Sequence, residues 1–219
     1  MMRPQRASPL AGAGSKRANP HMNSHNPRRP DHPVSQHFVD RWSPRAFTGE
    51  QIPDSTLMRI FEAARWAPSA SNLQPWTFLY ARRGSADFDK FHGLLAEGNR
   101  PWTKNAAAIV FLVSRKTRTN ADGTHAPSRS HSLDAGAAWA YLALEASAVG
   151  WPAHGMIGVD FDHARDELHV PDDCHIEMAI AIGRRGDKTA LPERLQGVEQ
   201  PNARKPVTEI VIAGAFPKR

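Results

Sequence analysis

Residues 67–76 read Ala-Pro-Ser-Ala-Ser-Asn-Leu-Gln-Pro-Trp, and this stretch marks the change from a predicted helix to a predicted strand. The apolar residues before it recur at the spacing of one helix face: Leu57, Ile60, Phe61 and Ala64. Asp54 is the expected N-cap of this helix, and Pro68 is the residue that stops it. After the stretch, large apolar side chains alternate along the chain as in a strand: Trp76, Phe78 and Tyr80, separated by Thr77 and Leu79.

The rest of the chain continues this alternation of helices and strands. Residues 106–113 are continuously apolar, the pattern of a central strand covered on both faces, and residues 114–130 are polar and predict a loop. A helix is predicted over residues 133–149, which Gly150 ends. The apolar face of that helix is expected at Leu133, Ala137, Ala140 and Leu144. The remaining predicted elements are a short helix over 162–169, a buried strand over 176–182 and a last strand over 207–213. Interleaved elements of both kinds predict an α/β-like or α+β fold.

The positive charge of the chain is concentrated at its amino terminus. The 28 Lys and Arg against 22 Asp and Glu give a formal net charge of +6. Residues 1–36 contain six of the basic residues and one acid, Asp31, so residues 37–219 keep 22 basic and 21 acidic residues, a charge of +1. This near-neutral part lacks a basic face with interleaved aromatics, so we expect no nucleic-acid partner.

Residues 1–36 are rich in Pro, Ser, Asn, His and Arg, which predicts a disordered basic tail before one domain over residues 37–219. The tail has no apolar segment of the kind found in secretory signals, and no later run reaches the ~18–20 apolar residues of a membrane helix. Cys174 is the single cysteine, which excludes an intramolecular disulfide. We therefore expect a cytoplasmic protein with no membrane partner.

Four polar or glycine-bearing segments at the ends of the predicted elements could together hold a ligand. Residues 40–47 read Asp-Arg-Trp-Ser-Pro-Arg-Ala-Phe, in which two arginines flank a serine, and a second basic pair occurs at residues 204–205. Arginine presents a planar fork of donors that matches phosphate oxygens. Residues 155–158 (Gly-Met-Ile-Gly) predict a turn with two glycines. Residues 68–72 are the fourth segment. Together the four segments suit a ligand with one phosphate and one flat polar ring. The alternative interpretation of residues 41–45 is an exposed basic turn.

In order and spacing, these segments resemble the FMN-dependent nitroreductase family over residues 37–216. The resemblance implies an α+β, nitroreductase-type fold with a central, mostly antiparallel sheet flanked by helices. It also implies a carboxy-terminal arm exchanged with the partner subunit of a homodimer. It further implies FMN as cofactor, NAD(P)H as co-substrate and a small-molecule acceptor such as a nitroaromatic or a quinone.

The same resemblance implies roles for individual residues. The phosphate and ribitol would be held from two segments: Arg41, Trp42, Ser43, Arg45, Arg204 and Lys205. Trp42 departs from the family pattern, in which a basic or polar residue is common, and the alignment of Lys205 is looser. Contacts to the flavin of the other subunit would come from Pro68, Ser69, Ala70 and Asn72. Backbone N–H groups would be offered to the flavin by Met156, Ile157 and Gly158.

No catalytic side chain is expected, because a flavin carries the hydride and the protein supplies binding and electrostatics. His154 adjoins the glycine turn, and both a contact to flavin or substrate and a solvated loop position remain open for it. The chain has no H-E-x-x-H pattern and no dinucleotide-binding G-x-G-x-x-G after a strand, so we expect no metal site and no built-in NAD(P)H domain. The alternatives to an FMN oxidoreductase are a non-catalytic FMN carrier and a nucleic-acid binder that uses its tail. The physiological acceptor and the choice between NADH and NADPH are not encoded in any recognisable pattern.

Overall fold

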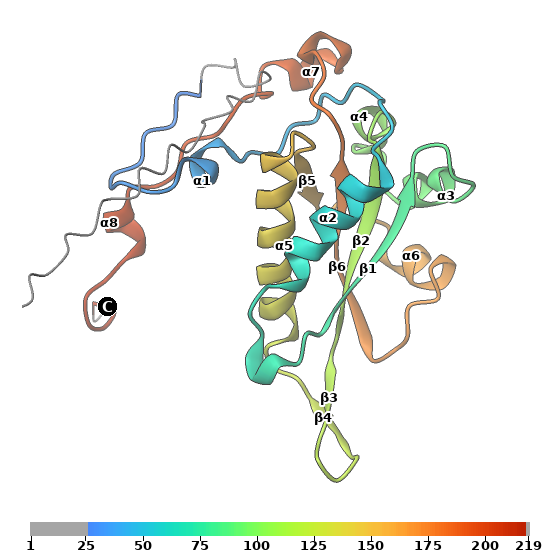
Figure 1. The fold of residues 1–219 in the computed structure, drawn as a ribbon, viewed down its shortest axis with the longest axis vertical. Coiled ribbons are helices and arrows are strands. Elements are labelled where there is room, and N and C mark those ends of the chain that lie inside the picture. The colour runs from blue at the N-terminus through green and yellow to red at the C-terminus, as the bar shows by residue number, and fades with distance from the viewer. Residues whose placement is uncertain (1–25, 218–219) are drawn as a thin grey trace, which may run out of the picture.

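The computed structural model describes residues 26–217, in which a four-stranded sheet lies between two layers of helices (Figure 1). The strands are β1 (Trp76–Arg82), β2 (Ala108–Arg115), β5 (Ala153–Met156) and β6 (Cys174–Ile182). They lie in the order β1-β2-β6-β5, and each neighbouring pair is antiparallel. β5 is therefore an edge strand, and one side of its backbone is directed away from the sheet.

Two helices cover one face of the sheet, namely α2 (Asp54–Arg65) and α5 (His131–Ala148). The opposite face is covered by α3 (Phe88–Gly93), α4 (Arg100–Thr103) and α6 (Phe161–Glu167). Side chains of β2 point alternately into the two cores, and residues 108–114 are all buried. The continuous apolar run of the central strand thus results from helices on both of its faces, as predicted.

The helix and strand predicted around residues 67–76 are confirmed. In α2 the predicted residues Leu57, Ile60 and Ala64 are fully buried, and β1 follows the turn. The expected cap is wrong in detail, since Pro53 occupies the N-cap position and no side chain caps the helix. Between α2 and β1 lies a single 3-10 turn, η1 (Ala70–Asn72).

Two other predictions need correction. The predicted loop over 114–130 contains a short hairpin, β3 (Thr117–Thr119) and β4 (His125–Pro127). Residues 207–213, predicted as a strand, instead begin with a single helical turn, α8 (Val207–Ile210), and continue in extended and bent backbone. This segment lies beside no other described strand, and β-branched residues alone do not make a strand without a partner.

The apolar face of α5 is not the one predicted. The residues that this helix buries include Ala135, Ala138, Leu142 and Ala146, whereas Leu133 is 79% exposed. Because this helix is apolar around most of its circumference, periodicity offers more than one candidate stripe. The predicted stripe faces away from the sheet.

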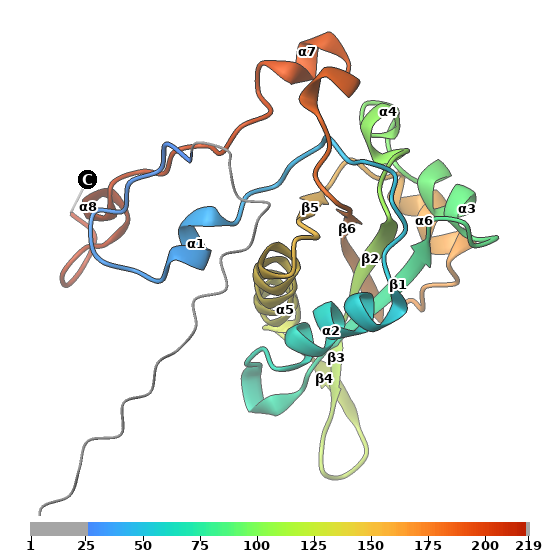
Figure 2. The same cartoon turned by 45° about the horizontal axis from the view of Figure 1, so that its top comes forward.

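The two ends of the described chain lie side by side, apart from the sheet (Figures 1 and 2). The amino-terminal segment leads into α1 (Gln36–Asp40), and the carboxy-terminal segment passes through η2 (Lys188–Ala190) and α7 (Glu193–Gln196) before α8. Residues 26–36, assigned to the predicted tail, make hydrogen bonds with residues 39–41, 202 and 207. The rest of that tail, residues 1–25, lies outside the described residues. Within residues 26–217, no helix combines the length and the apolar character needed to cross a membrane.

Candidate functional site

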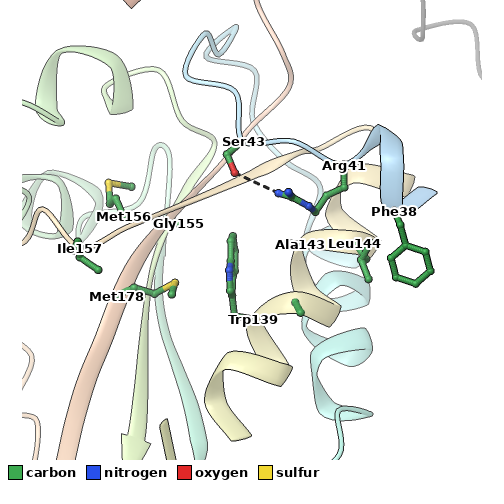
Figure 3. Close-up of a pocket in the computed structure, with 11 residues that line it drawn as sticks. Phe38, Arg41, Ser43, Trp139, Ala143, Leu144, Gly155, Met156, Ile157 and Met178 are labelled. Atoms are coloured by element: carbon green, nitrogen blue, oxygen red, sulfur yellow. Dashed lines mark hydrogen bonds between the residues drawn. The ribbon is translucent and has the colours of Figure 1, made fainter. Parts of the chain in front are cut away.

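A cavity of about 600 Å³ opens between α1, the middle of α5 and the edge strand β5 (Figure 3). Its lining combines two polar side chains with a mostly apolar wall: Phe38, Arg41, Ser43, Trp139, Ala140, Ala143, Leu144, Gly155, Met156, Ile157 and Met178. The volume falls within the ~300–1,000 Å³ typical of small-molecule sites. Small residues of α5 and the lack of a side chain at Gly155 leave this space open.

The polar side of the cavity is formed by Arg41 and Ser43. The guanidinium Nη1 of Arg41 donates to the Ser43 hydroxyl at 3.4 Å (Figure 3). Burial, and next the nearby positive charge of Arg204, lower the pKa of Arg41 from its ordinary value. A half-buried guanidinium with a cationic neighbour and no ion pair among the described residues is well suited to bind an anion.

His154 of β5 holds the segment that carries these two residues. Its Nδ1 lies 3.0 Å from the main-chain oxygen of Pro44, and its ring lies 4.7 Å from the Trp102 ring, centroid to centroid. Burial is the main cause that lowers the pKa of His154 to about 4, with Arg45 and Arg41 contributing in the same direction. The imidazole is therefore neutral at neutral pH, and Nδ1 carries the proton that it donates to the carbonyl. The solvated-loop alternative for His154 is wrong, because the residue belongs to β5 and its ring contacts Pro44 and Trp102.

Glu199 fixes the same segment from the carboxy-terminal side. Its Oε1 accepts hydrogen bonds from the main-chain N–H groups of Arg45 at 2.7 Å and Ala46 at 2.8 Å. Its Oε2 is buried and has no hydrogen-bond partner among the described residues. The backbone of residues 44–46 is thus held by β5 on one side and by the chain between α7 and α8 on the other.

The predicted glycine turn is in part a strand. Gly155 and Met156 belong to β5, and the chain turns only after them. A Cβ at Gly155 would lie 3.0 Å from both Trp139 and Met178, so glycine allows these side chains to pack beneath the strand. A Cβ at Gly158 would collide with the Asn99 amide, which donates to the Gly158 carbonyl at 3.0 Å. Asn99 thereby anchors the chain that leaves β5.

The second predicted basic pair lines a separate cavity of about 450 Å³ between the two ends of the described chain. Arg204 and Lys205 form part of its wall, together with Arg28, and Phe38 lines both cavities. Arg204 Nη1 donates to the main-chain oxygen of Ala203 at 2.9 Å. Sequence reasoning missed Arg28 because it lies in the segment predicted to be a disordered tail.

Residues 68–72 lie beside the first turn of α5, whereas the cavity is lined by residues 139–144 in the middle of that helix. The buried Asp134, in the first turn of α5, accepts from the N–H of Ala70 at 3.2 Å and from the Ser130 hydroxyl at 2.9 Å. Ser71 and Asn72 adopt left-handed backbone with φ of 51° and 54°. Such conformations are uncommon for residues other than glycine and need a context that fixes them.

The predicted site residues thus fall into three groups. The first cavity is lined by Arg41, Ser43, Met156 and Ile157, with Gly158 immediately after them. The second cavity is lined by Arg204 and Lys205, whereas Pro68, Ser69, Ala70 and Asn72 lie apart from both. The side chains of Trp42 and Arg45 line neither cavity. Among the lining residues that sequence reasoning missed, Trp139 and Leu144 had no signal beyond an apolar helix.

One Ser–His–carboxylate cluster occurs in the described part of the chain, at the far end of β2. The buried Ser114 hydroxyl lies 2.7 Å from Nδ1 of His131 and donates to the Glu177 carboxylate. In a nucleophilic triad the histidine stands between the hydroxyl and the acid. Here one ring nitrogen, His131 Nδ1, faces both the Ser114 hydroxyl and Oε1 of Glu177 (3.5 Å), so the histidine does not stand between a hydroxyl and the acid. The Ser132 hydroxyl also donates to Glu177, at 2.8 Å, and the arrangement is therefore not that of a triad. Residues 26–217 contain no group of His, Cys, Asp and Glu side chains arranged to hold a metal ion.

Comparisons with known proteins agree with this architecture. The Nitroreductase family profile matches residues 39–97 and 81–184. A Streptomyces coelicolor protein named "Putative NADH dehydrogenase/NAD(P)H nitroreductase" is 29% identical over 177 residues, which cover 72% of this chain and 85% of that protein. A crystal structure described as an oxidoreductase containing FMN is 44% identical with a TM-score of 0.86, covering 90% of this chain and 100% of that one.

A more distant structure, from Desulfovibrio desulfuricans and in complex with FMN, shares the fold, with a TM-score of 0.65 at 24% identity over 85% of this chain and 99% of that one. An antiparallel sheet between helical layers and a family match that extends over most of the domain lead to one assignment: this chain belongs to the nitroreductase family, whose members are oxidoreductases.

Proposed function

We propose that this protein is an FMN-dependent NAD(P)H oxidoreductase that reduces nitroaromatics, quinones or related small electron acceptors in a ping-pong cycle. The observation that carries the proposal is the cavity with Arg41 and Ser43 on one side and the edge of β5 on the other. The names of the relatives support it, since one contains FMN and others are described as NAD(P)H nitroreductases.

The residues around the cavity fit FMN. A phosphate monoester matches the half-buried guanidinium of Arg41 and the adjacent Ser43 hydroxyl, with Arg204 close enough to affect the pKa of Arg41. A flat ring matches the apolar wall formed by Trp139, Leu144 and the neighbouring alanines of α5. The unpaired edge of β5 supplies backbone groups for the polar atoms of such a ring.

When bound, FMN would supply the chemistry that transfers a hydride from NAD(P)H to the second substrate. The protein's own residues bind, orient and exclude water. Arg41, Ser43 and Arg204 would anchor the phosphate, while His154 and Glu199 keep the backbone of the anchoring segment in place. Trp139 and Met178 would close the inner side of the cavity to water.

We further propose a homodimer with shared flavin sites. Residues 68–72 are exposed or half-exposed beside the first turn of α5, and none of them lines the cavity of their own chain. The carboxy-terminal arm exposes apolar side chains that a partner could cover, including Ile210 (68% exposed) and Phe216 (86% exposed). The outward apolar stripe of α5 offers a second surface for close packing across a two-fold axis.

Turnover tests the activity directly. The purified protein should carry FMN, lose its yellow colour when NADH or NADPH is added without oxygen, and recover it when an acceptor is supplied. Parallel rates for both nucleotides with a panel of nitroaromatics and quinones would identify the substrates. A flavin that neither nucleotide reduces would leave the protein as a non-catalytic FMN carrier.

Mixed dimers test the shared site. An Arg41→Ala subunit combined with an Asn72→Ala subunit should recover one intact site per heterodimer, because both lesions then fall in the other site. The expected activity is near half of the wild-type value in isolated heterodimers. Absence of recovery, or an active flavin-loaded monomer in sedimentation, would contradict shared sites.

A further inference from the structure

One side chain of the amino-terminal segment joins the two segments that carry the candidate phosphate ligands. Arg28 Nη1 donates to the main-chain oxygen of Arg41 at 2.7 Å and to that of Val39 at 3.0 Å. Its Nε donates to the main-chain oxygen of Asn202 at 2.7 Å, across 174 positions of sequence. A single guanidinium therefore bridges the chain just before Ser43 and the chain just before Arg204.

A second contact fastens the same two segments. The main-chain N–H of Val207 donates to Asp31 at 2.7 Å, so the arm is tied to the amino-terminal segment on both sides of Arg204. Arg29, although adjacent, takes no part in these ties. Its guanidinium donates to the main-chain oxygens of Asn26 and Arg28, both within its own segment.

The bridge also brings three positive charges together. Burial, and then the positive charges of Arg204 and Arg41, lower the pKa of Arg28. Burial and Arg204 in turn lower the pKa of Arg41. Two acids lie near this group. Oδ1 of Asp40 accepts from the amides of Gln36 and Asn26, and Asp31, which lines the second cavity, accepts from the Val207 N–H. Three guanidinium groups that repel one another form a site whose charge an incoming phosphate would neutralise.

We propose that Arg28 is a positioning residue of the FMN phosphate site, which sets Arg41 and Arg204 at a fixed separation and adds a third positive charge to the site. The inference rests on the proposed function, because it takes FMN as the ligand of Arg41. It divides the predicted tail in two: residues 26–36 belong to the binding site, and the prediction of a disordered tail is left with residues 1–25, which lie outside the described residues.

FMN and riboflavin distinguish this role from general support of the fold, since they differ only in the phosphate. Dissociation constants for both are measured by flavin fluorescence quenching for wild type, Arg28→Gln, Arg28→Lys and Arg29→Gln. Arg28→Gln should weaken FMN binding about 10- to 100-fold and leave riboflavin binding within about threefold. Arg28→Lys keeps the charge without the planar fork and should fall between. Arg29→Gln removes the same charge one position away and should resemble wild type.

Hydrogen exchange of the flavin-free protein gives a readout that does not depend on flavin. Amides of residues 202–210 should exchange faster in Arg28→Gln than in Arg29→Gln. If Arg28→Gln weakens FMN and riboflavin binding equally, Arg28 does not position the phosphate site. If FMN affinity and amide exchange are both unchanged, Arg28 does not bridge the two segments either. A wild-type protein that binds neither flavin would instead overturn the proposed function, while the exchange data would still report on the bridge.

Discussion

Acid should destabilise this protein through His154. The folded protein holds this imidazole neutral, with a pKa of about 4 against the ordinary value of 6.5, chiefly because it is buried. The unfolded chain binds the proton more readily than the folded one between these two values. The stability linked to His154 is therefore fully present above pH 6.5 and is lost as the pH falls from 6.5 to 4.

The size of the pKa shift of His154 determines how much stability is lost in acid. A difference of 2.5 pKa units corresponds to about 3 kcal/mol of unfolding free energy per subunit once the pH is below 4. At pH 5.0 the linkage equation gives about 2 kcal/mol of this loss. The perturbation is His154→Asn, which places an N–H donor near the position of Nδ1 but does not titrate. His154→Phe removes the donor and keeps a ring beside Trp102.

Urea unfolding at fixed protein and flavin concentrations measures the effect at pH 7.5 and 5.0. When the pH falls from 7.5 to 5.0, the free energy of unfolding of the wild type should decrease by about 2 kcal/mol more than that of either variant. At pH 7.5, His154→Asn should be close to wild type, and His154→Phe should be lower by about 1 kcal/mol for the lost bond to Pro44. If His154→Asn shows the same pH dependence as wild type, the reasoning about this histidine is refuted.

Three further predictions follow from the site. Arg41→Ala and Arg204→Ala should each raise the FMN dissociation constant roughly 10- to 150-fold in fluorescence titrations, since a charge-assisted bond to phosphate is lost; values within about twofold of wild type for both would place the phosphate elsewhere. Asp134→Ala should lower the free energy of unfolding by about 1–3 kcal/mol, because the amide of Ala70 loses its acceptor, and Asp134→Asn should cost less; equal costs would argue against that bond. Glu199→Ala should cost about 2–3 kcal/mol by leaving two main-chain amides without a partner, and a protein of unchanged stability would show that water replaces the carboxylate.

The elements with dense local patterns were predictable. Continuous apolar residues identified β2, and an apolar stripe ended by proline identified α2. The sequence patterns gave wrong predictions where neighbouring elements of the fold decide which structure a segment adopts. α5 is apolar on several sides, so its sequence does not say which side meets the sheet. Residues 207–212, which are β-branched except for Glu209, have no neighbouring strand among the described residues, so they do not form one here.

The residues of the candidate site could be predicted from the sequence where they belong to short motifs. Arg41 and Ser43, predicted as phosphate ligands because an arginine fork beside a hydroxyl is a local signal, both line the first cavity. The residues that hold them were not found, because their contacts cross large distances in sequence. His154 is 110 positions from Pro44, and Glu199 is 154 positions from Arg45. Arg28 was missed because composition placed it in a tail, while its hydrogen bonds are visible only in the folded chain.

A crystal structure of the protein grown with FMN tests the central claim most directly. The account predicts the phosphate within hydrogen-bond distance of Arg41 and Ser43 and the ring in the cavity beside Gly155–Ile157, with residues 68–72 of a partner subunit against it. A phosphate bound away from Arg41, or a ring that lies outside this cavity, would contradict the account.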